Sequence, residues 1–400
     1  MILESKHFTT FTGAGISTAS GIPDYRSGAN TVLPTGAGCW ETAANIQKAR
    51  KEGKLYHAPA KKAEFNMKIS QAMPSKTHMA MVAMQDAGLL KHIISQNIDG
   101  LHRKSGIHGE NISELHGNTN LEKCRKCGKD YMRDFKVSNP QIKGHGTGRK
   151  CDNGNCKGDL YDSIINFGEN LNEYILERGE QMGYASDIML CMGSSLRVTP
   201  ACDIPKDMTF LGGKMVICNL QKTPLDSYAS LIIHAKCDDM IELLMKKLNM
   251  AIPQFKLQRW LKVKLDDIGQ GKDKMTVSGI DRNGGPFELF KSIRINGGVR
   301  NQVTLKETDN DQVAVKLTFQ GHYNENVLQL NISRKMVRDN GNKVLIKMVG
   351  NPYATAPRRM RFTNWEAPMA YLNQNEPLGP ISFAQFDVND PLKYSNMEPE

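Results

Sequence analysis

Two close pairs of cysteines place the strongest single constraint on how this chain folds. Cys124 and Cys127 stand in the string CRKC, Cys151 and Cys156 stand in CDNGNC, and twenty-three residues separate the two pairs. This spacing suits a tetrahedral four-thiolate zinc site, which is closed and structural because four sulfurs leave no position for water. A redox-active CxxC is the less favoured alternative, since two pairs occur together without a thioredoxin-like context. We therefore predict a small zinc-binding module over residues 118–160.

The residues around this module favour a parallel sheet. Five short apolar runs end in Gly, Asn or other polar residues, and they read HFTTFTG, HIISQN, DIMLCMG, KMVICNL and SLIIHA. Helical patterns lie between several of them, such as SKTHMAMVAMQDAG, where we expect Ser75 to cap the helix and Gly88 to end it. Strands separated by helices indicate an α/β fold with a Rossmann-type sheet covered on both faces. We assign residues 1–250 to this domain.

The character of the sequence changes after residue 250. Seven short alternating runs between residues 259 and 349 are separated by turn strings such as DRNGGP, NGG and DNGN. This spacing is typical of an antiparallel sandwich or barrel. We therefore expect residues 251–400 to form a C-terminal β-rich, sandwich-like domain, with an irregular tail over the last fifty residues.

Composition and charge exclude several classes of protein. Apolar residues make up 40% and charged residues 24% of the 400-residue chain, and no apolar run is long enough to cross a bilayer. The start lacks the pattern of a secretory signal, and nine cysteines, an odd number, favour a reducing compartment. The net charge is +10, and residues 123–158 hold ten Lys or Arg against three acidic residues. Such a patch fits contact with nucleic acid or an acidic protein, and a solvated module surface explains it equally well.

A glycine loop follows the first predicted strand, in the string FTGAGISTASGIPDYRS. Gly13 and Gly15 would let the backbone approach a phosphate, and Asp24, Tyr25 and Arg26 follow shortly after. The dehydrogenase fingerprint needs a third glycine where Thr18 stands. The loop therefore predicts a nucleotide site without hydride transfer.

Polar residues also follow the later strands. Gln96, Asn97 and Asp99 come directly after HII, where α/β folds bind their ligands, although Asx residues at strand ends commonly only make turns. His116 in ELHGN is a candidate general base, with a packed or surface histidine as the ordinary alternative. Further candidates follow the third and fourth of these strands and open the last helix: Gly193, Ser194, Ser195, Asn219 and Cys237.

The short motifs in this chain are, in order, GAGIS, PDYR, SQNIDGLH, LHGN, CxxC, CxxxxC, NFGE, GSSL, CNLQ and KCDD. The order of these motifs resembles that of the sirtuin family over residues 8–247. Within that family the sequence resembles class IV, and most closely the nuclear or nucleolar seventh-sirtuin type. The loop SGANTVLPTGAGCWE is longer than this resemblance leads us to expect, and the family pattern also implies a segment ahead of the first strand.

The resemblance implies an NAD-dependent protein-lysine deacylase with NAD and Zn²⁺ as cofactors. His116 would be the general base, with Asn97 and Asp99 in the catalytic pocket, and Phe167 and Gly168 would pair with the substrate peptide. The residues that the resemblance places around NAD are Gly13, Ala14, Gly15, Ser17, Asp24, Tyr25, Arg26, Gln96, Asn97, Ile98, Asp99, Gly193, Ser194, Ser195, Asn219 and Cys237.

The same resemblance implies the reaction and its setting. Acetyl or other acyl groups would leave lysines of histones or other nuclear proteins, giving nicotinamide and O-acyl-ADP-ribose. Mono-ADP-ribosyl transfer in the same cleft and a non-enzymatic chromatin- or RNA-binding scaffold are the alternatives. We expect a nuclear location, substrate lysines in acylated proteins, contact with nucleic acid or chromatin, and no membrane partner.

Overall fold

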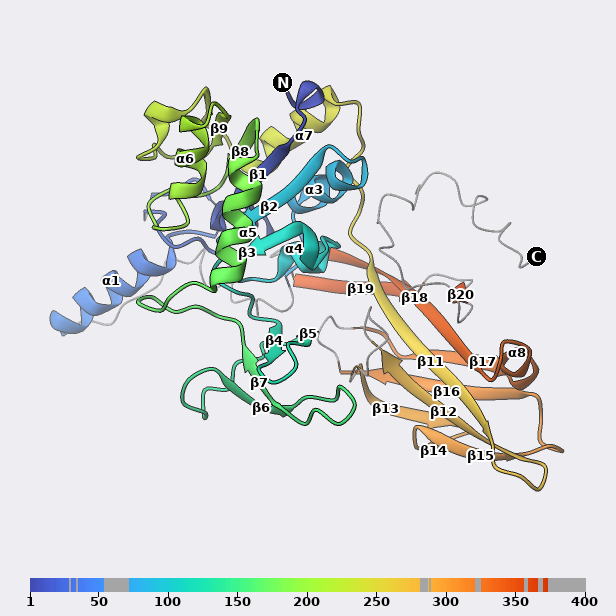
Figure 1. Ribbon diagram of the computed structural model, residues 1–400. Helices are drawn as coiled ribbons and strands as arrows, with labels where there is room; N and C mark the ends of the chain where they lie inside the picture. Colours follow the sequence, from blue (N-terminus) through green and yellow to red (C-terminus); the bar gives the residue numbers. More distant parts are fainter. Residues whose placement is uncertain are drawn as a thin grey trace. The chain divides into compact units, whose positions relative to one another are not determined.

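The computed structural model describes residues 1–28, 30–33, 35–53, 72–280, 287, 289–320, 325–355, 359–365 and 370–372. The described chain divides into two compact units, one of residues Met1–Gln254 and one that begins at Phe255 (Figure 1). No helix among these residues is long and apolar enough to cross a membrane.

A six-stranded parallel sheet is the centre of the first unit. Its order is β10-β9-β8-β1-β2-β3, so the chain builds outward from β1 to one edge and later returns to build the other half from β8. The strands are β1 (Phe8–Thr12), β2 (Leu90–Ser95), β3 (Ile112–Glu114), β8 (Ile188–Met192), β9 (Lys214–Cys218) and β10 (Leu231–Ile233). The five predicted strands are confirmed. The sequence analysis missed β3, because three residues are too few to show a pattern.

Helices cover both faces of this sheet. They are α3 (Lys76–Asp86), α4 (Leu101–Ser105), α5 (Glu173–Tyr184), α6 (Asp203–Phe210) and α7 (Cys237–Lys247), whereas α1 (Cys39–Lys51) buries none of its residues. On one face Phe8 packs in a core with Met84 of α3 and Ile241 of α7. On the other face Phe11 packs with Ile204 and Met208 of α6. This two-sided burial explains why every residue of the central strands β1 and β8 is buried.

The predicted helix after Ser75 begins and ends as expected. The Ser75 hydroxyl accepts a hydrogen bond from the backbone N–H of His78, and the His78 ring accepts from the Ser75 backbone N–H. The helix ends at Asp86, and Gly88 follows with a positive φ of 70°. The histidine takes the place that Glu or Gln usually fills in such a capping box.

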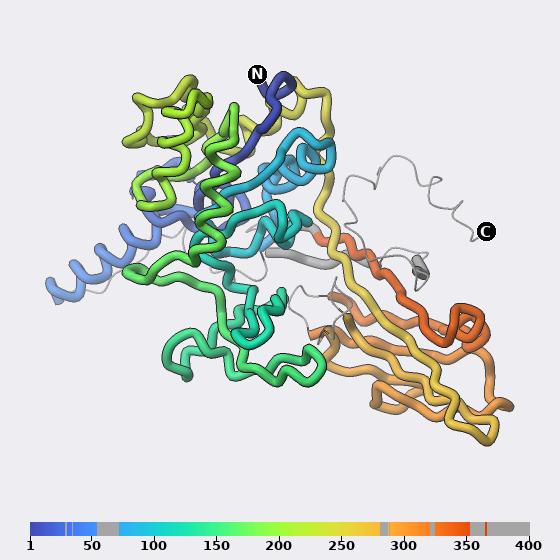
Figure 2. Tube along the Cα trace, in the orientation of Figure 1, coloured from blue at the N-terminus to red at the C-terminus, as the bar shows by residue number. Residues whose placement is uncertain are grey.

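The chain leaves the parallel sheet after β3, forms the small module and returns at α5 (Figure 2). The module contains a second, four-stranded sheet with the order β5-β4-β7-β6. Its strands are β4 (Leu121–Cys124), β5 (Asp130–Met132), β6 (Gly146–Lys150) and β7 (Asp159–Asp162). The insertion predicted over residues 118–160 therefore has an ordered antiparallel framework.

The second unit is a sandwich of two antiparallel sheets, as the alternating runs predicted. One sheet has the order β15-β12-β11-β18-β19 with β20 also on β18, and the other has the order β14-β13-β16-β17. Inward residues of both sheets, such as Val263 of β11 and Val315 of β16, share one core. The elements are β11 (Leu257–Asp267), β12 (Lys272–Ile280), β13 (Phe290–Ile295), β14 (Gly298–Val299), β15 (Gln302–Lys306), β16 (Gln312–Phe319), β17 (Leu328–Ser333), α8 (Arg334–Asp339), β18 (Lys343–Thr355), β19 (Arg359–Trp365) and β20 (Ala370–Leu372).

The expected irregular tail is wrong for its first part. β18 runs on to Thr355, and both β19 and β20 pair with it. The backbone N–H and C=O groups there form hydrogen bonds with partner strands. The proline- and asparagine-rich composition therefore does not prevent strand formation. Residues 373–400 lie outside the described part of the chain.

Candidate functional site

The candidate site lies where the strand order of the parallel sheet reverses. β1 stands between β8 and β2, so the segments that follow β1 and β8 run in opposite directions. Ligands of α/β sheets bind in the crevice at such a point, outside the carboxyl ends of the strands. The predicted motifs after Thr12, Ser95 and Met192 all meet at this edge.

The glycines of the first loop are required by close packing against the segment after β8. The N–H groups of Gly13 and Gly15 donate to the carbonyl oxygens of Met192 and Gly193, at 3.0 and 2.8 Å. A Cβ atom on Gly15 would lie 2.6 Å from the Cα of Gly193. These two N–H groups are therefore engaged within the protein. The N–H groups of the short helix η2 (Ala14–Ser20), which begins at Ala14 and contains Ser17, follow directly.

We expect Gly15→Ala to destabilise the protein by about 1–3 kcal/mol, because the added methyl group meets backbone atoms that cannot rotate away. The measurement is the shift of the urea unfolding midpoint, together with the affinity for NAD. Gly28→Ala is the matched control, since a Cβ there meets nothing within 4 Å and Gly28 has no positive φ. Equal midpoints for the two variants would contradict the packing argument.

Two buried polar side chains follow β2. The Asp99 carboxylate accepts a hydrogen bond from the Ser17 hydroxyl at 2.6 Å and from the backbone N–H of Leu101 at 2.9 Å. The Asn97 amide donates to the carbonyl oxygen of Gly13 at 3.0 Å. Asp99 therefore does act as a turn residue at the start of a helix, as Asx residues after strands commonly do. A carboxylate has about four lone-pair sites, so Asp99 keeps the capacity to accept an amide of a ligand.

Gln96 joins three elements of the site. Its backbone N–H donates to the carbonyl oxygen of Thr12 at 3.0 Å, and its side-chain oxygen accepts from the Ser194 hydroxyl at 2.7 Å. Its own carbonyl oxygen accepts from Nδ1 of His116 at 3.0 Å. The strand ends of β1, β2 and β8 are thereby linked to the predicted base.

This last bond sets the tautomer of His116. A carbonyl oxygen only accepts, so Nδ1 carries the hydrogen and Nε2 keeps its lone pair. Nε2 makes no hydrogen bond to any residue that the structure describes. Burial lowers the pKa of His116 from its usual value, against the opposing effect of the Gln96 carbonyl. At neutral pH the ring is therefore neutral and able to take a proton.

The segment after the glycine loop folds back on the start of α1. The carbonyl oxygens of Asp24 and Tyr25 accept hydrogen bonds from the backbone N–H groups of Cys39 and Trp40. The Tyr25 ring lies 5.6 Å from the Trp40 ring, and the Arg26 guanidinium lies 4.3 Å above it. The long loop that departs from the family pattern is thus closed at its base by backbone bonds.

Phe167 and Gly168 occupy a turn and not a strand. The Glu169 N–H donates to the carbonyl oxygen of Asn166 at 3.1 Å, and Gly168 has a φ of 89°. These features define a type II turn, which requires a positive φ at its third residue. Phe167 is 78% exposed and contacts Trp40, with ring centroids 5.6 Å apart. The turn therefore presents backbone and an apolar ring to solvent.

The remaining candidates line the edge of the sheet toward β9 and β2. Gly193, Ser194 and Ser195 directly follow β8. Asn219 follows β9, with its amide bonded to the carbonyl oxygen of Gln221, and Cys237 begins α7 in a buried position. The carbonyl oxygen of Ile98 accepts from the N–H of Thr119 at 2.8 Å. Among the described residues, no direct bond joins Asn219 or Cys237 to the glycine loop.

Sequence reasoning missed the buried carboxyl group of Glu114. It accepts a hydrogen bond from the Asn118 amide at 2.8 Å and lies 3.7 Å from the Arg103 guanidinium. Burial raises its pKa to about 7, although Arg103 and Asn118 oppose the shift. Its position two residues before His116 was the only available signal, and spacing alone does not reveal burial.

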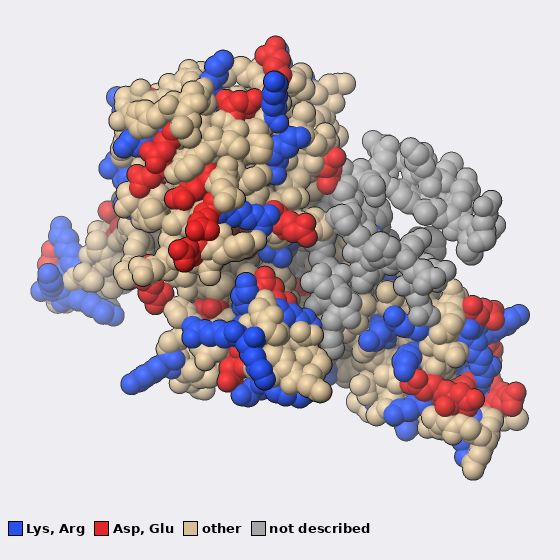
Figure 3. All heavy atoms as spheres, in the orientation of Figure 1, with Lys and Arg blue, Asp and Glu red and all other residues tan. Residues whose placement is uncertain are grey.

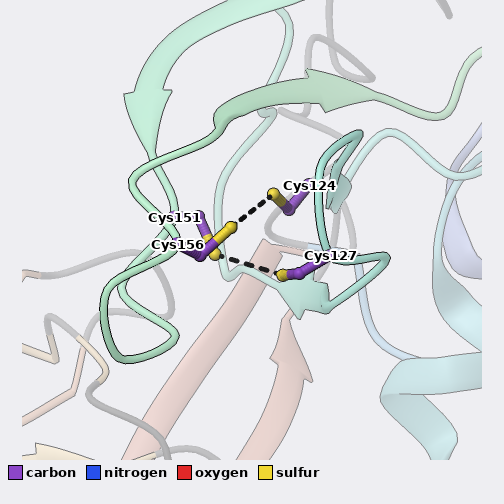
Figure 4. A group of neighbouring side chains, drawn as sticks. All are labelled: Cys124, Cys127, Cys151 and Cys156. Carbon is purple, nitrogen blue, oxygen red and sulfur yellow. Dashed lines mark hydrogen bonds between the residues drawn. The ribbon is translucent and has the colours of Figure 1, made fainter.

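The four predicted cysteine ligands form one cluster (Figure 4). Their sulfur atoms all lie within 4.8 Å of one another, with Cys124 and Cys156 at 3.6 Å and Cys127 and Cys151 at 3.5 Å. A tetrahedral Zn²⁺ with bonds of about 2.3 Å requires sulfurs about 3.8 Å apart, whereas a disulfide needs about 2.05 Å. The cluster therefore fits zinc and not two disulfides.

The surroundings of the cluster also fit a metal. The Lys129 backbone N–H and the Asn153 side chain lower the pKa of Cys127 to about 6, which favours the thiolate form at neutral pH. A Cβ on Gly158 would lie 2.7 Å from the Cys124 sulfur, so only glycine lets that strand approach. Tyr131, which is buried, contacts the Cys151 sulfur and the Asp152 carboxylate through its hydroxyl. Asp152 and His145 are bonded elsewhere and lie outside this four-sulfur cluster.

Lysine and arginine side chains gather over the module (Figure 3). Five of the ten basic residues between 123 and 158 pair with acidic groups: Lys123, Lys129, Arg133, Arg149 and Lys150. The buried Glu122 holds Arg133 and Arg149 at 2.8 and 2.7 Å. Half of the basic residues in the patch thus have acidic partners within the module itself.

Comparison with known proteins places this architecture in a family. A sequence profile described as the Sir2 family matches residues 13–200. The NAD-dependent protein deacetylase SRT1 of Arabidopsis thaliana is 42% identical over 255 residues, which are 64% of this chain and 49% of that protein. The NAD-dependent protein deacetylase Sirt6 of Drosophila melanogaster is 35% identical over 264 residues, 64% of this chain and 75% of that protein.

The NAD-dependent protein deacetylase sirtuin-7 of Homo sapiens is 37% identical over 268 residues, 65% of this chain and 60% of that protein. This similarity confirms the resemblance to the seventh-sirtuin type. The chain spans about half the length of the Arabidopsis relative and about three quarters of the Drosophila one. The residues that the profile matches include the glycine loop, His116 and the cysteine cluster, and the chain belongs to the Sir2 family.

Proposed function

We propose that this chain removes acetyl or other acyl groups from protein lysines with consumption of NAD. The observation that carries the proposal is a neutral histidine, His116, whose Nδ1 is fixed by the Gln96 carbonyl at the switch point of the sheet. His116 follows β3, and the buried Asn97 and Asp99 follow the neighbouring strand β2. Membership of the Sir2 family and the names of its relatives support the reaction type.

The residues at the strand ends fit a dinucleotide. The loop of Gly13 to Ser17 and residues Gly193–Ser195 would hold the phosphates and a ribose, while Asn219 and Cys237 would flank the adenosine. Asp24, Tyr25 and Arg26 would close over the nicotinamide side, with Gln96, Asn97, Ile98 and Asp99 beneath it. When bound, NAD supplies the ribose carbon that the acyl oxygen attacks and nicotinamide as the leaving group.

The protein side of the mechanism follows from these positions. Asp99, held by Ser17 and the Leu101 N–H, would grip the nicotinamide amide and favour its departure. Nε2 of His116 would take a proton from a ribose hydroxyl. The Tyr25–Trp40 pair would exclude water from the reacting carbon. The products would be nicotinamide, the free lysine and O-acyl-ADP-ribose.

The finer parts of the proposal concern domains, substrates and location. Residues 1–250 would be the catalytic domain, and residues 251–400 a separate β-rich domain. Histones and other nuclear proteins would be the substrates, and the protein would act in the nucleus or nucleolus. Contact with nucleic acid or chromatin would use the basic residues of the module that have no acidic partner among the described residues, such as Lys136 and Lys143.

Incubation of the full chain with NAD and acetylated histone peptides tests this function. We expect nicotinamide release that depends on the peptide, and O-acyl-ADP-ribose in equal amount. Label transfer from NAD to protein without deacylation would instead indicate mono-ADP-ribosyl transfer. No nicotinamide release with any acylated peptide would contradict both reactions and leave the scaffold alternative.

A further inference from the structure

His145 contacts two carboxylates at once, one through each ring nitrogen. Nδ1 lies 2.8 Å from an oxygen of Asp162, and Nε2 lies 3.2 Å from an oxygen of Glu169. Ionised carboxylates only accept hydrogen bonds, so both nitrogens must carry hydrogen for both bonds to form. The geometry therefore specifies the charged imidazolium, and deprotonation removes one of the two bonds.

The two carboxylates hold the two ends of one segment. Asp162 ends β7, and its side chain also accepts a hydrogen bond from the N–H of Ile164 at 3.1 Å. Glu169 closes the turn that carries Phe167 and Gly168, because its carboxylate accepts from the Asn166 N–H at 2.7 Å. His145 thus connects the start of the 163–169 segment with its end.

This segment lies against the candidate base. The N–H of Ile165 donates to the carbonyl oxygen of His116 at 3.1 Å, and the Ser163 hydroxyl accepts from the N–H of Asn118 at 3.0 Å. A Cβ on Gly117 would lie 1.8 Å from the carbonyl oxygen of Ser163, so the two backbones touch. The position of the segment therefore sets how a bound peptide would meet His116.

The exposed face of the turn is open to a partner. The backbone N–H groups of Phe167 and Gly168 donate to no acceptor within the described part of the chain. An extended peptide can pair with such groups by adding a strand. The turn would present them at a fixed place only while Glu169 is anchored.

We propose that His145 is a proton-dependent clasp that fixes the Asn166–Glu169 turn and so makes acyl-peptide affinity depend on pH. His145 is a positioning residue that acts through Glu169 and Asp162. The inference rests on the proposed function, because it assigns peptide binding to this turn. A plain surface ion pair would instead hold the module together without any effect on peptide affinity.

The surroundings support proton control in the neutral range. The hydrogen bonds to Asp162 and then Glu169 raise the pKa of His145 above its usual value, against a smaller effect of burial. These two carboxylates, from β7 and from the turn, are the charged groups that act on it. Since the folded pKa is raised, the clasp is complete below the ordinary histidine pKa and is lost as the pH rises through the raised value.

Steady-state kinetics of the full chain between pH 6 and 9 test the clasp. As the pH rises, we expect the KM for the acylated peptide to increase about two- to fivefold, the range of a partly exposed ion pair. The KM for NAD should not follow this change. His145→Gln should show the high-pH peptide KM at every pH with kcat retained. His7→Gln, outside the module, should keep the wild-type profile.

A second measurement keeps the clasp testable if the protein proves inactive as a deacylase. NMR titration of the His145 ring should give a raised pKa, which Glu169→Gln should lower. Relative to the intrinsic exchange rate at each pH, the amides of Asn166 and Glu169 should be protected at pH 6, less protected at pH 9, and weakly protected at both in His145→Gln. A flat peptide KM in an active wild-type enzyme, or protection that depends neither on pH nor on His145, would overturn the proposal.

Discussion

His116→Tyr is expected to lower kcat for deacylation by about two to four orders of magnitude, the usual contribution of a general base. The substitution removes the neutral imidazole of His116, whose Nε2 is the proton acceptor of the proposed mechanism. A phenol with its high pKa cannot take that role at neutral pH. The buried Asn97 and Asp99 would remain in place. The measurement is nicotinamide and O-acyl-ADP-ribose formation under saturating peptide and NAD.

Two controls isolate the chemical role of His116. The variant should keep the wild-type melting temperature, because the His116 ring makes a single hydrogen bond to the residues that the structure describes, to the Gln96 carbonyl. His108→Gln, at the start of a short helix outside the crevice, should retain the wild-type rate. Full activity in His116→Tyr would remove the assignment of the base while leaving the NAD site intact.

Loss of the metal is expected to have the second large effect. Cys151→Ser should release zinc and unfold the module, because the buried Cys151 supplies one of the four thiolates and structural zinc binding is worth about 10–16 kcal/mol in small domains. Metal content per chain and proteolysis between β4 and β7 are the measurements. Deacylation should fall too, since the segment after β7 contacts the backbone of His116.

Cys39→Ser is the matched control for the metal. Cys39 is exposed and stands outside the cluster, so this variant should bind zinc with wild-type stoichiometry. A strong chelator should reproduce the Cys151→Ser result, and added zinc should reverse it. One zinc per chain in Cys151→Ser with an intact module would contradict the four-thiolate assignment.

The parts of the fold that local sequence specifies were predictable. The strand around Leu190 carries continuous apolar residues, and the alternating runs of β11 and β16 bury every second side chain. Short elements were not predictable, because the three residues of β3 have no detectable period. The strand β19 was also missed, because its stability comes from pairing with β18 and not from composition.

Some parts of the candidate site were likewise predictable from the sequence, and others were not. The cysteine ligands were identified in full, because zinc demands fixed residue types at short spacing. The partners of the polar residues were not, because they come from distant parts of the chain. Ser17 meets Asp99 across 82 positions, and Ser194 meets Gln96 across 98.

The sequence by itself determined the parallel α/β class, the metal ligands and the family of this protein, since each depends on residue types at short range. Only the tertiary structure decided that Gly15 must pack on Gly193, that His116 holds its hydrogen on Nδ1, and that His145 bridges Asp162 and Glu169. Contacts of this kind depend on which backbones the sheet and the module bring within a few ångströms. No local pattern encodes that distance.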